Sequence, residues 1–191
     1  KTVDPTYGMP GVWISPEQRG DAERLGCMIF DPVSVVATQL TEVVRAHASD
    51  LLGRQEVQAL IDTIKKTHPA VVKEVVPDAL TLGEVQKVLQ NLVKERVSIR
   101  DLVSILETMA DNVHMTKDPE MLTEFVRVSL SRTICKEYMN NEGTINVITL
   151  DPQIEQVIQQ RIHRSETGSF LNLDPNMGQE ILQAIQGQVQ V

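Results

Sequence analysis

Five dipeptides in this sequence place a side chain that can cap a helix directly before a proline. They are Ser15-Pro16, Asp31-Pro32, Asp118-Pro119, Asp151-Pro152 and Asp174-Pro175. A serine or aspartate oxygen accepts a hydrogen bond from a free amide at a helix start, and proline fits the first helical position. Thr81 with Glu84 adds a capping box, and Ser98 with Asp101 a weaker one. The chain is therefore predicted to consist mainly of helices with well-marked starts.

Between Arg54 and Tyr138 the apolar residues recur at helical spacing in four stripes. The stripes are Val57, Leu60, Ile61 and Ile64; Val85, Val88, Leu89, Leu92 and Val93; Leu102, Ile105, Leu106 and Met109; and Leu122, Phe125, Val126, Leu130 and Ile134. The linkers at 67–69 and 112–119 are short, so neighbouring helices are expected to pack together. We interpret the stripes as the core of an all-helical subdomain over residues 53–137.

The two flanks show a mixed pattern. Residues 11–14 and 27–30 are predicted strands, and residues 17–25 and 33–49 predicted helices. After Tyr138, alternation over 145–150 predicts a strand and 153–163 a helix, while the stretch 165–170 and the Gln-rich end from Gln179 offer one further helix and no closing strand. The fold class is therefore α+β and predominantly α, a helical bundle or superhelix between two partial α/β subdomains, of ferredoxin-like type, at residues 1–52 and 138–191.

Composition excludes several functions. Eighteen Lys and Arg against 26 Asp and Glu give a net charge of -8, and only 3% of residues are aromatic. Nucleic acid is therefore not an expected partner. Cys27 and Cys135 show no metal-ligand spacing, which predicts two buried, unpaired thiols in a reducing compartment. No apolar run is long enough to cross a bilayer and there is no signal peptide; the start at Lys1 and the polar end suggest a fragment of a longer protein.

Motifs for covalent chemistry are lacking. The sequence has no P-loop, dinucleotide fingerprint, nucleophile elbow or zinc-protease motif. Asp111 and His114 are the best acid–base candidates, but such a pair at a helix end is far more often a solvated cap. The four histidines lie in four different segments. We therefore expect no enzyme activity, no cofactor and no metal, and interpret the chain as a binding protein.

The N-terminal stretch DPTYGMPGVW, residues 4–13, has no helical or strand periodicity of its own. Asp4-Pro5 and Gly8 are typical of a tight turn that leads into a strand. Tyr7 then has two interpretations: an aromatic packed over that strand, or an exposed aromatic that forms a docking hot spot beside a carboxylate. The local sequence leaves both open.

Several longer segments carry a family resemblance. YGMPGVWI, DPVSVVATQL, DLLGRQEVQALID, VPDALTLGEVQKVLQNLVKERVSIRDLVSILETMAD and KDPEMLTEFVRVSLSRTI, in this order, resemble the cytoplasmic region of type III protein-export gates, the FHIPEP family. The resemblance covers residues 3 to about 160. The GRQEVQ segment favours the flagellar branch over the virulence branch of injectisomes, which is the alternative.

The resemblance implies an architecture and partners. Export gates of this family have an N-terminal membrane half and a cytoplasmic half of four subdomains, which forms a nonameric ring. The ring receives substrates with their export chaperones and works with other export-apparatus proteins. This chain would be the cytoplasmic part of a bacterial inner-membrane protein: the end of the first subdomain, the helical third and a truncated fourth. It would reach the membrane only through the missing N-terminal half.

The resemblance also assigns the chaperone-binding residues. An aspartate and an aromatic in the family's DPxFGLP segment, and the threonine of its VATH segment, correspond to Asp4, Tyr7 and Thr38. Two residues depart from the family pattern: Tyr7 replaces the common phenylalanine, and Gln39 replaces the usual histidine after Thr38. Tyrosine keeps the aromatic area and is itself favoured at interfaces. An unrelated helical scaffold, and an enzyme using Asp111 and His114, are the competing hypotheses.

Overall fold

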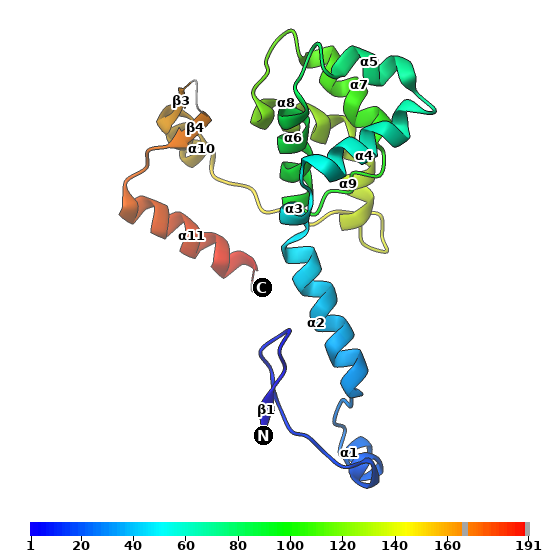
Figure 1. The fold of residues 1–191 in the computed structure, drawn as a ribbon. Helices are drawn as coiled ribbons and strands as arrows, with labels where there is room; N and C mark the ends of the chain where they lie inside the picture. Colours follow the sequence, from blue (N-terminus) through cyan, green and yellow to red (C-terminus); the bar gives the residue numbers. More distant parts are fainter. Residues whose placement is uncertain (166–167, 190–191) are drawn as a thin grey trace. The chain divides into compact units, whose positions relative to one another are not determined.

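The structure is a computed structural model that describes residues 1–165 and 168–189 (Figure 1). It divides into two units, residues 1–103 and residues 104–191, which are described separately. The described residues are mostly helical, with two small antiparallel sheets of two strands each. The prediction of a predominantly α, α+β chain is therefore confirmed.

The first unit contains a hairpin, a long helix and a group of shorter helices. Its elements are β1 (Thr2–Val3), β2 (Pro10–Gly11), the 3-10 helix η1 (Pro16–Gln18), α1 (Arg19–Arg24), α2 (Pro32–Ala46), α3 (Ala48–Leu51), α4 (Arg54–Lys65), α5 (Pro69–Val75) and α6 (Leu82–Lys94). The second unit contains the helices and hairpin that follow. They are α7 (Leu102–Asn112), which starts at the boundary, α8 (Pro119–Ser129), α9 (Ser131–Tyr138), α10 (Pro152–Arg161), β3 (Ile162–Ser165), β4 (Gly168–Leu171) and α11 (Pro175–Val189).

The predicted helix starts are confirmed. Asp31, Asp118 and Asp151 each accept a hydrogen bond from an amide in the first turn of α2, α8 and α10, at 2.8–3.1 Å. Thr81 and Glu84 form a capping box, in which each side chain bonds the other residue's amide. The weaker box was misplaced: α7 begins at Leu102, so Asp101 rather than Ser98 precedes the helix.

The core of the first unit comes from the predicted stripes. Val57 and Ile61 on α4 are buried, and Val85, Val88, Leu89 and Leu92 on α6 are fully buried. α6 packs against both α4 and α3, and α4 packs against α5. The stripe residues Leu60, Ile64 and Val93 are only half-buried, because they lie at the edge of the apolar face.

The buried residues of α7 and α8 also follow the stripes. They are Leu102, Ile105, Leu106 and Met109 on α7, and Leu122 and Val126 on α8, with Leu130 just after it. Every element from Arg54 to Tyr138 is a helix, as predicted. The subdomain boundaries at residues 52 and 137 remain predictions.

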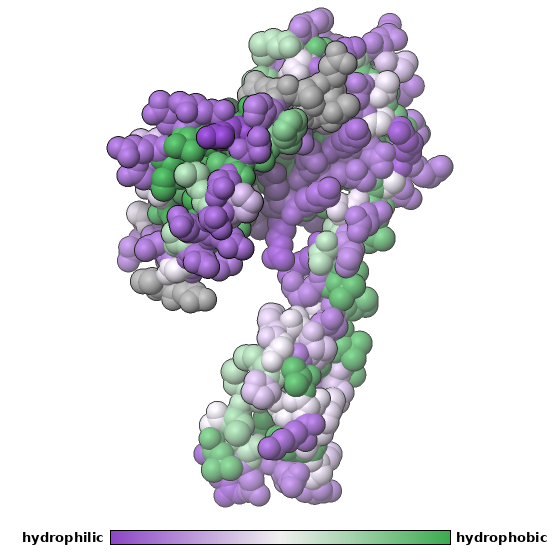
Figure 2. All heavy atoms as spheres, turned by 90° about the vertical axis from the view of Figure 1, so that its left-hand side faces the viewer, coloured by the Kyte–Doolittle hydropathy of each residue, from purple (hydrophilic) through white to green (hydrophobic). Residues whose placement is uncertain are grey.

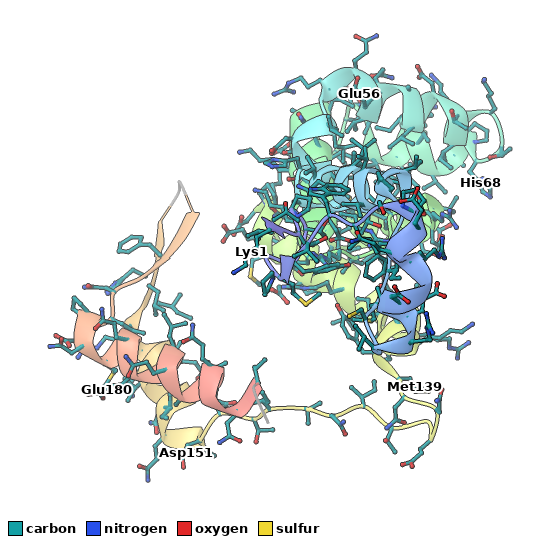
Figure 3. The ribbon with its side chains drawn as sticks, turned by 90° about the horizontal axis from the view of Figure 1, so that it is seen from below. Lys1, Glu56, His68, Met139, Asp151 and Glu180 are labelled. Atoms are coloured by element: carbon teal, nitrogen blue, oxygen red, sulfur yellow. The ribbon has the colours of Figure 1, made fainter. Side chains whose placement is uncertain are left out.

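The predicted strands at 11–14, 27–30 and 145–150 are wrong, apart from Gly11 in β2. A strand requires a neighbouring strand to pair its backbone groups, and within the described chain these segments have none. Trp13, Met28 and Phe30 are consequently exposed. Residues 145–151 form an extended connection, visible between Met139 and Asp151 in Figure 3.

A hairpin in the second unit was not predicted. The helix expected to reach His163 ends at Arg161, and β3 pairs with β4 from there, with Ile162 opposite Leu171. His163 stacks on Phe170, its cross-strand partner, with ring centroids 5.4 Å apart. In the 165–170 stretch, residues 166 and 167 lie outside the described residues. The further helix predicted at the Gln-rich end is confirmed as α11.

The two cysteines were predicted to be buried, and this is wrong. Both are unpaired, as predicted, but both are exposed. Cys27 follows α1 in an irregular segment, where its amide donates to the carbonyl of Ala22. In the part of the chain that the structure describes, this segment belongs to no sheet that could cover its thiol. Cys135 lies on α9, a helix without buried residues.

Candidate functional site

The N-terminal stretch forms a closed turn between β1 and β2, where Thr2 pairs with Gly11 and Val3 with Pro10. The amide of Asp4 donates to the carbonyl of Met9 at 2.8 Å, and the amide of Gly8 donates to the carbonyl of Asp4 at 2.9 Å. Gly8 has a φ of 68°, a left-handed conformation that favours glycine. We call residues 4–9 the N-terminal turn.

Asp4 organises this turn with its side chain. One carboxylate oxygen accepts hydrogen bonds from the amide of Thr6 at 3.0 Å and from the amide of Tyr7 at 2.7 Å. This is an Asx-type turn, in which an aspartate satisfies amides that the tight backbone leaves unpaired. The half-buried Asp4 therefore holds the backbone that carries Tyr7.

The Tyr7 side chain is 65% exposed. This exposure is what the docking interpretation requires. The docking role itself remains a prediction. Exposed aromatics of this kind supply much of the binding free energy at protein interfaces, because they bury a large area with few rotatable bonds.

Thr38, the third predicted residue, lies on α2 and is also exposed. The structure brings the N-terminal turn to this part of α2 through a side-chain hydrogen bond: the Thr6 hydroxyl donates to the side-chain oxygen of Gln39 at 2.8 Å. Thr6 and Gln39 were missed as site residues. No local pattern could have revealed the pair, because they are 33 residues apart.

The helix that carries Thr38 has an apolar surface. None of the residues of α2 is buried, and five of its apolar side chains are exposed: Val33, Val36, Leu40, Val43 and Val44. Figure 2 shows hydrophobic side chains at the surface along this helix. At its start, hydrogen bonds from the hydroxyl and the amide of Ser34 hold the pKa of Asp31 below the usual range of an aspartate.

The acid–base candidates lie at the end of α7. Asp111 is in the last turn and His114 just beyond it, and both are exposed, as is typical of a solvated helix end. Within residues 1–165 and 168–189, no group of three or more His, Cys, Asp or Glu side chains is placed to hold a metal ion. In the same described ranges, no helix has the length and hydropathy needed to cross a bilayer.

Comparison with known proteins gives a consistent result. The sequence model of the FHIPEP family matches residues 1–191. The chain is 40% identical over 185 residues to the flagellar biosynthesis protein FlhA of Bacillus subtilis and 42% identical over 188 residues to that of Treponema pallidum. Each match covers 97% of this chain but only 27% and 26% of the relative. The chain thus spans about a quarter of the length of these relatives.

Solved structures give the same family likeness. The CdsV protein of Chlamydia pneumoniae, in a structure titled as its complex with CdsO, aligns with a TM-score of 0.82 and 31% identity, over 92% of this chain and 51% of the other. The nonameric SctV-C of EPEC aligns with a TM-score of 0.76 and 30% identity, over 90% of this chain and 53% of the other.

Proposed function

The chain belongs to the FHIPEP family of export proteins, and we propose that it is a cytoplasmic part of the flagellar type III protein-export gate. The observation that carries this proposal is the family match over the whole of residues 1–191, together with about 40% identity to flagellar FlhA proteins. Its longer parent would be an inner-membrane protein. Its work would be binding and transfer of export substrates, without catalysis by this chain.

We further propose that the N-terminal turn and α2 form a docking site for export chaperones that carry substrates. Tyr7 would be the anchor, because it is exposed on a turn whose backbone is held by Asp4. Thr38 would contribute from α2, to which Thr6 and Gln39 join the turn. The site combines one large aromatic with smaller polar groups, the usual composition of an interface hot spot and its surroundings.

The exposed apolar side chains of residues 12–44 support a place in a larger assembly. Val12, Trp13, Met28 and Phe30 lie on segments that pair with no strand among the described residues, as expected if the rest of a ferredoxin-like subdomain lies elsewhere in the parent protein. A nonameric ring is proposed by likeness to SctV-C, and contact with other export-apparatus proteins by likeness to the CdsV–CdsO complex.

A virulence-type export gate is the second candidate. The solved neighbours include CdsV and SctV-C, which share the fold at 31% and 30% identity. The flagellar relatives of Bacillus subtilis and Treponema pallidum share 40% and 42% identity, each over 97% of this chain. The higher identity favours the flagellar role.

The test is binding of purified flagellar chaperone–substrate complexes to the full-length protein or its whole cytoplasmic half. Tyr7→Ala should reduce affinity about 30-fold, the loss for a hot-spot aromatic worth about 2 kcal/mol. The melting temperature should change little, because an exposed side chain contributes little to folding. Tyr138→Ala is the matched control, since Tyr138 is 60% exposed and lies outside the site.

Unchanged affinity in a folded Tyr7→Ala protein would refute the docking site. If the parent binds injectisome chaperones and not flagellar ones, the virulence role replaces the flagellar one.

A further inference from the structure

We infer that the hydrogen bond between Thr6 and Gln39 anchors the N-terminal turn to α2 and makes these two residues positioning residues for docking. The inference rests on the proposed function, because it concerns how that site is held. The carrying observation is the distance of 2.8 Å between the Thr6 hydroxyl and the Gln39 side-chain oxygen, across 33 residues of sequence.

The N-terminal turn is a rigid unit because hydrogen bonds join its residues to one another. The Asp4 carboxylate accepts from the amides of Thr6 and Tyr7, and the Asp4 backbone bonds Gly8 and Met9. Any restraint on the position of Thr6 therefore also restrains the backbone of its neighbour, Tyr7. Fixing Thr6 at one point of α2 also restricts where the Tyr7 ring can lie.

The β1–β2 hairpin alone stabilises the N-terminal turn only weakly. β1 and β2 are two residues each, and a two-stranded hairpin of that size is marginal in water. Thr6 and Gln39 are both half-buried, so water competes less for their hydrogen bond than for one on an open surface. The bond thus supplies an attachment to α2 that the hairpin lacks.

The position on α2 connects the anchor to the other predicted contact. Gln39 directly follows Thr38, so the anchored turn and the Thr38 hydroxyl are held within the same stretch of the molecule. A partner that contacts Tyr7 and Thr38 together would bind a preformed surface. Without the anchor, the same partner would have to order the turn as it binds, which lowers affinity.

Four single variants of the full-length protein, one double variant and Tyr7→Ala test this inference. Thr6→Val removes the donor at nearly constant volume, and Gln39→Leu removes the acceptor. Gln39→Glu keeps an acceptor oxygen in place. Thr63→Val is the matched control, because the Thr63 hydroxyl donates within α4 to the carbonyl of Ala59 at 2.8 Å, away from the site.

Two measurements are made on each variant. The first is affinity for a purified flagellar chaperone–substrate complex; the second is amide exchange of residues 4–9 without any partner. Thr6→Val and Gln39→Leu should each weaken binding roughly 2- to 10-fold and speed exchange of the turn. The double variant Thr6→Val/Gln39→Leu should lose no more affinity than either single variant, because both remove the same hydrogen bond. Gln39→Glu and Thr63→Val should leave both readouts near those of the parent.

The inference is overturned if Thr6→Val binds like the parent while Tyr7→Ala binds weakly, since docking would then not need the anchor. It is also overturned if exchange of residues 4–9 stays unchanged in Thr6→Val and Gln39→Leu. A different result would refute the proposed function: Tyr7→Ala itself would bind the chaperone–substrate complex as tightly as the parent. That result would overturn this inference as well.

Discussion

The side-chain amide of Gln90 on α6 lies 3.0 Å from the carbonyl oxygen of Leu52, the residue that follows α3. The same amide nitrogen lies 3.1 Å from the carbonyl oxygen of Ser49. Each of these carbonyls has one further donor: the amide of Leu52 donates to Ser49, and the side-chain amide of Gln86 donates to Leu52. Gln90 thus donates hydrogen bonds to carbonyl oxygens at the end of α3 and holds this end against α6.

Gln90→Leu should therefore lower the free energy of unfolding by about 0.5–1.5 kcal/mol, because two hydrogen bonds between α6 and the end of α3 are lost while each carbonyl keeps one other donor. The measurement is urea unfolding followed by far-UV circular dichroism. Gln86→Leu is the comparison, since Gln86 donates to the Leu52 carbonyl at 3.0 Å and its loss leaves Gln90 in place. A larger loss from Gln86→Leu than from Gln90→Leu would contradict this account.

These contacts show which parts of the molecule the sequence could predict. Helix starts depend on residues within one turn of each other, so Asp31-Pro32 and the Thr81–Glu84 box were read correctly. The apolar stripes were also reliable, because a helix of this length has one face to bury. The Gln90–Leu52 bond joins residues 38 positions apart, and nothing local marks it.

Strands and site contacts were harder to predict, for a related reason. A strand forms only with a partner, so the apolar segments at 12–14 and 27–30 look like strands but stay irregular in the described chain. The hairpin β3–β4 was missed because its residues, which include His163 and Ser169, show no apolar alternation. Of the site, the turn with Gly8 was predictable, whereas the contact of Thr6 with Gln39 was not.

The residue after α6 gives a second prediction. Arg96 has a φ of 61°, and its amide and that of Val97 bond the carbonyls of Val93 and Leu92, which ends the helix in a left-handed residue. Glycine adopts this conformation without strain. Arg96→Gly should therefore raise the free energy of unfolding by about 0.5–1 kcal/mol.

The matched control is Arg100→Gly, four residues later in the loop before α7. Arg100 has no positive φ, so glycine there only adds freedom to the unfolded chain and should destabilise slightly. Thermal unfolding of the two variants should give shifts of opposite sign. Shifts of the same sign would show that strain at Arg96 is not the cause.

The start of α2 should respond to acid. Hydrogen bonds from Ser34 hold the pKa of Asp31 below its usual range, so the ionised form is favoured in the folded protein. A group of this kind stabilises the fold above the pKa of the unfolded chain, and the contribution is lost as pH falls through the folded pKa. The first turn of α2 should therefore weaken below about pH 4.

An NMR titration of the Asp31 carboxyl carbon measures this directly. Ser34→Ala should move the pKa of Asp31 up toward its ordinary value, because the hydroxyl hydrogen bond is the largest cause of the shift. Asp31→Asn should remove the acid response of the first turn of α2. A carboxyl that titrates in the usual range in the parent protein would contradict the cap geometry.

The last prediction separates two roles for Asp4 in the proposed docking site. Its carboxylate bonds the amides of Thr6 and Tyr7 in its own turn, so we expect it to hold Tyr7 in place and not to attract the partner by charge. Asp4→Asn keeps an acceptor oxygen and removes the charge; Asp4→Ala removes both. In the full-length protein, Asp4→Asn should keep most of the affinity for a chaperone–substrate complex.

Asp4→Ala should lose affinity roughly 2- to 10-fold, less than Tyr7→Ala, because the turn loosens while the aromatic remains. Amide exchange of Tyr7 should rise in Asp4→Ala and change little in Asp4→Asn, since the retained amide oxygen can still accept its hydrogen bond. If both variants lose affinity equally while the Tyr7 amide stays protected in Asp4→Asn, then the charge of Asp4 contacts the partner directly, and its role in orienting Tyr7 is secondary.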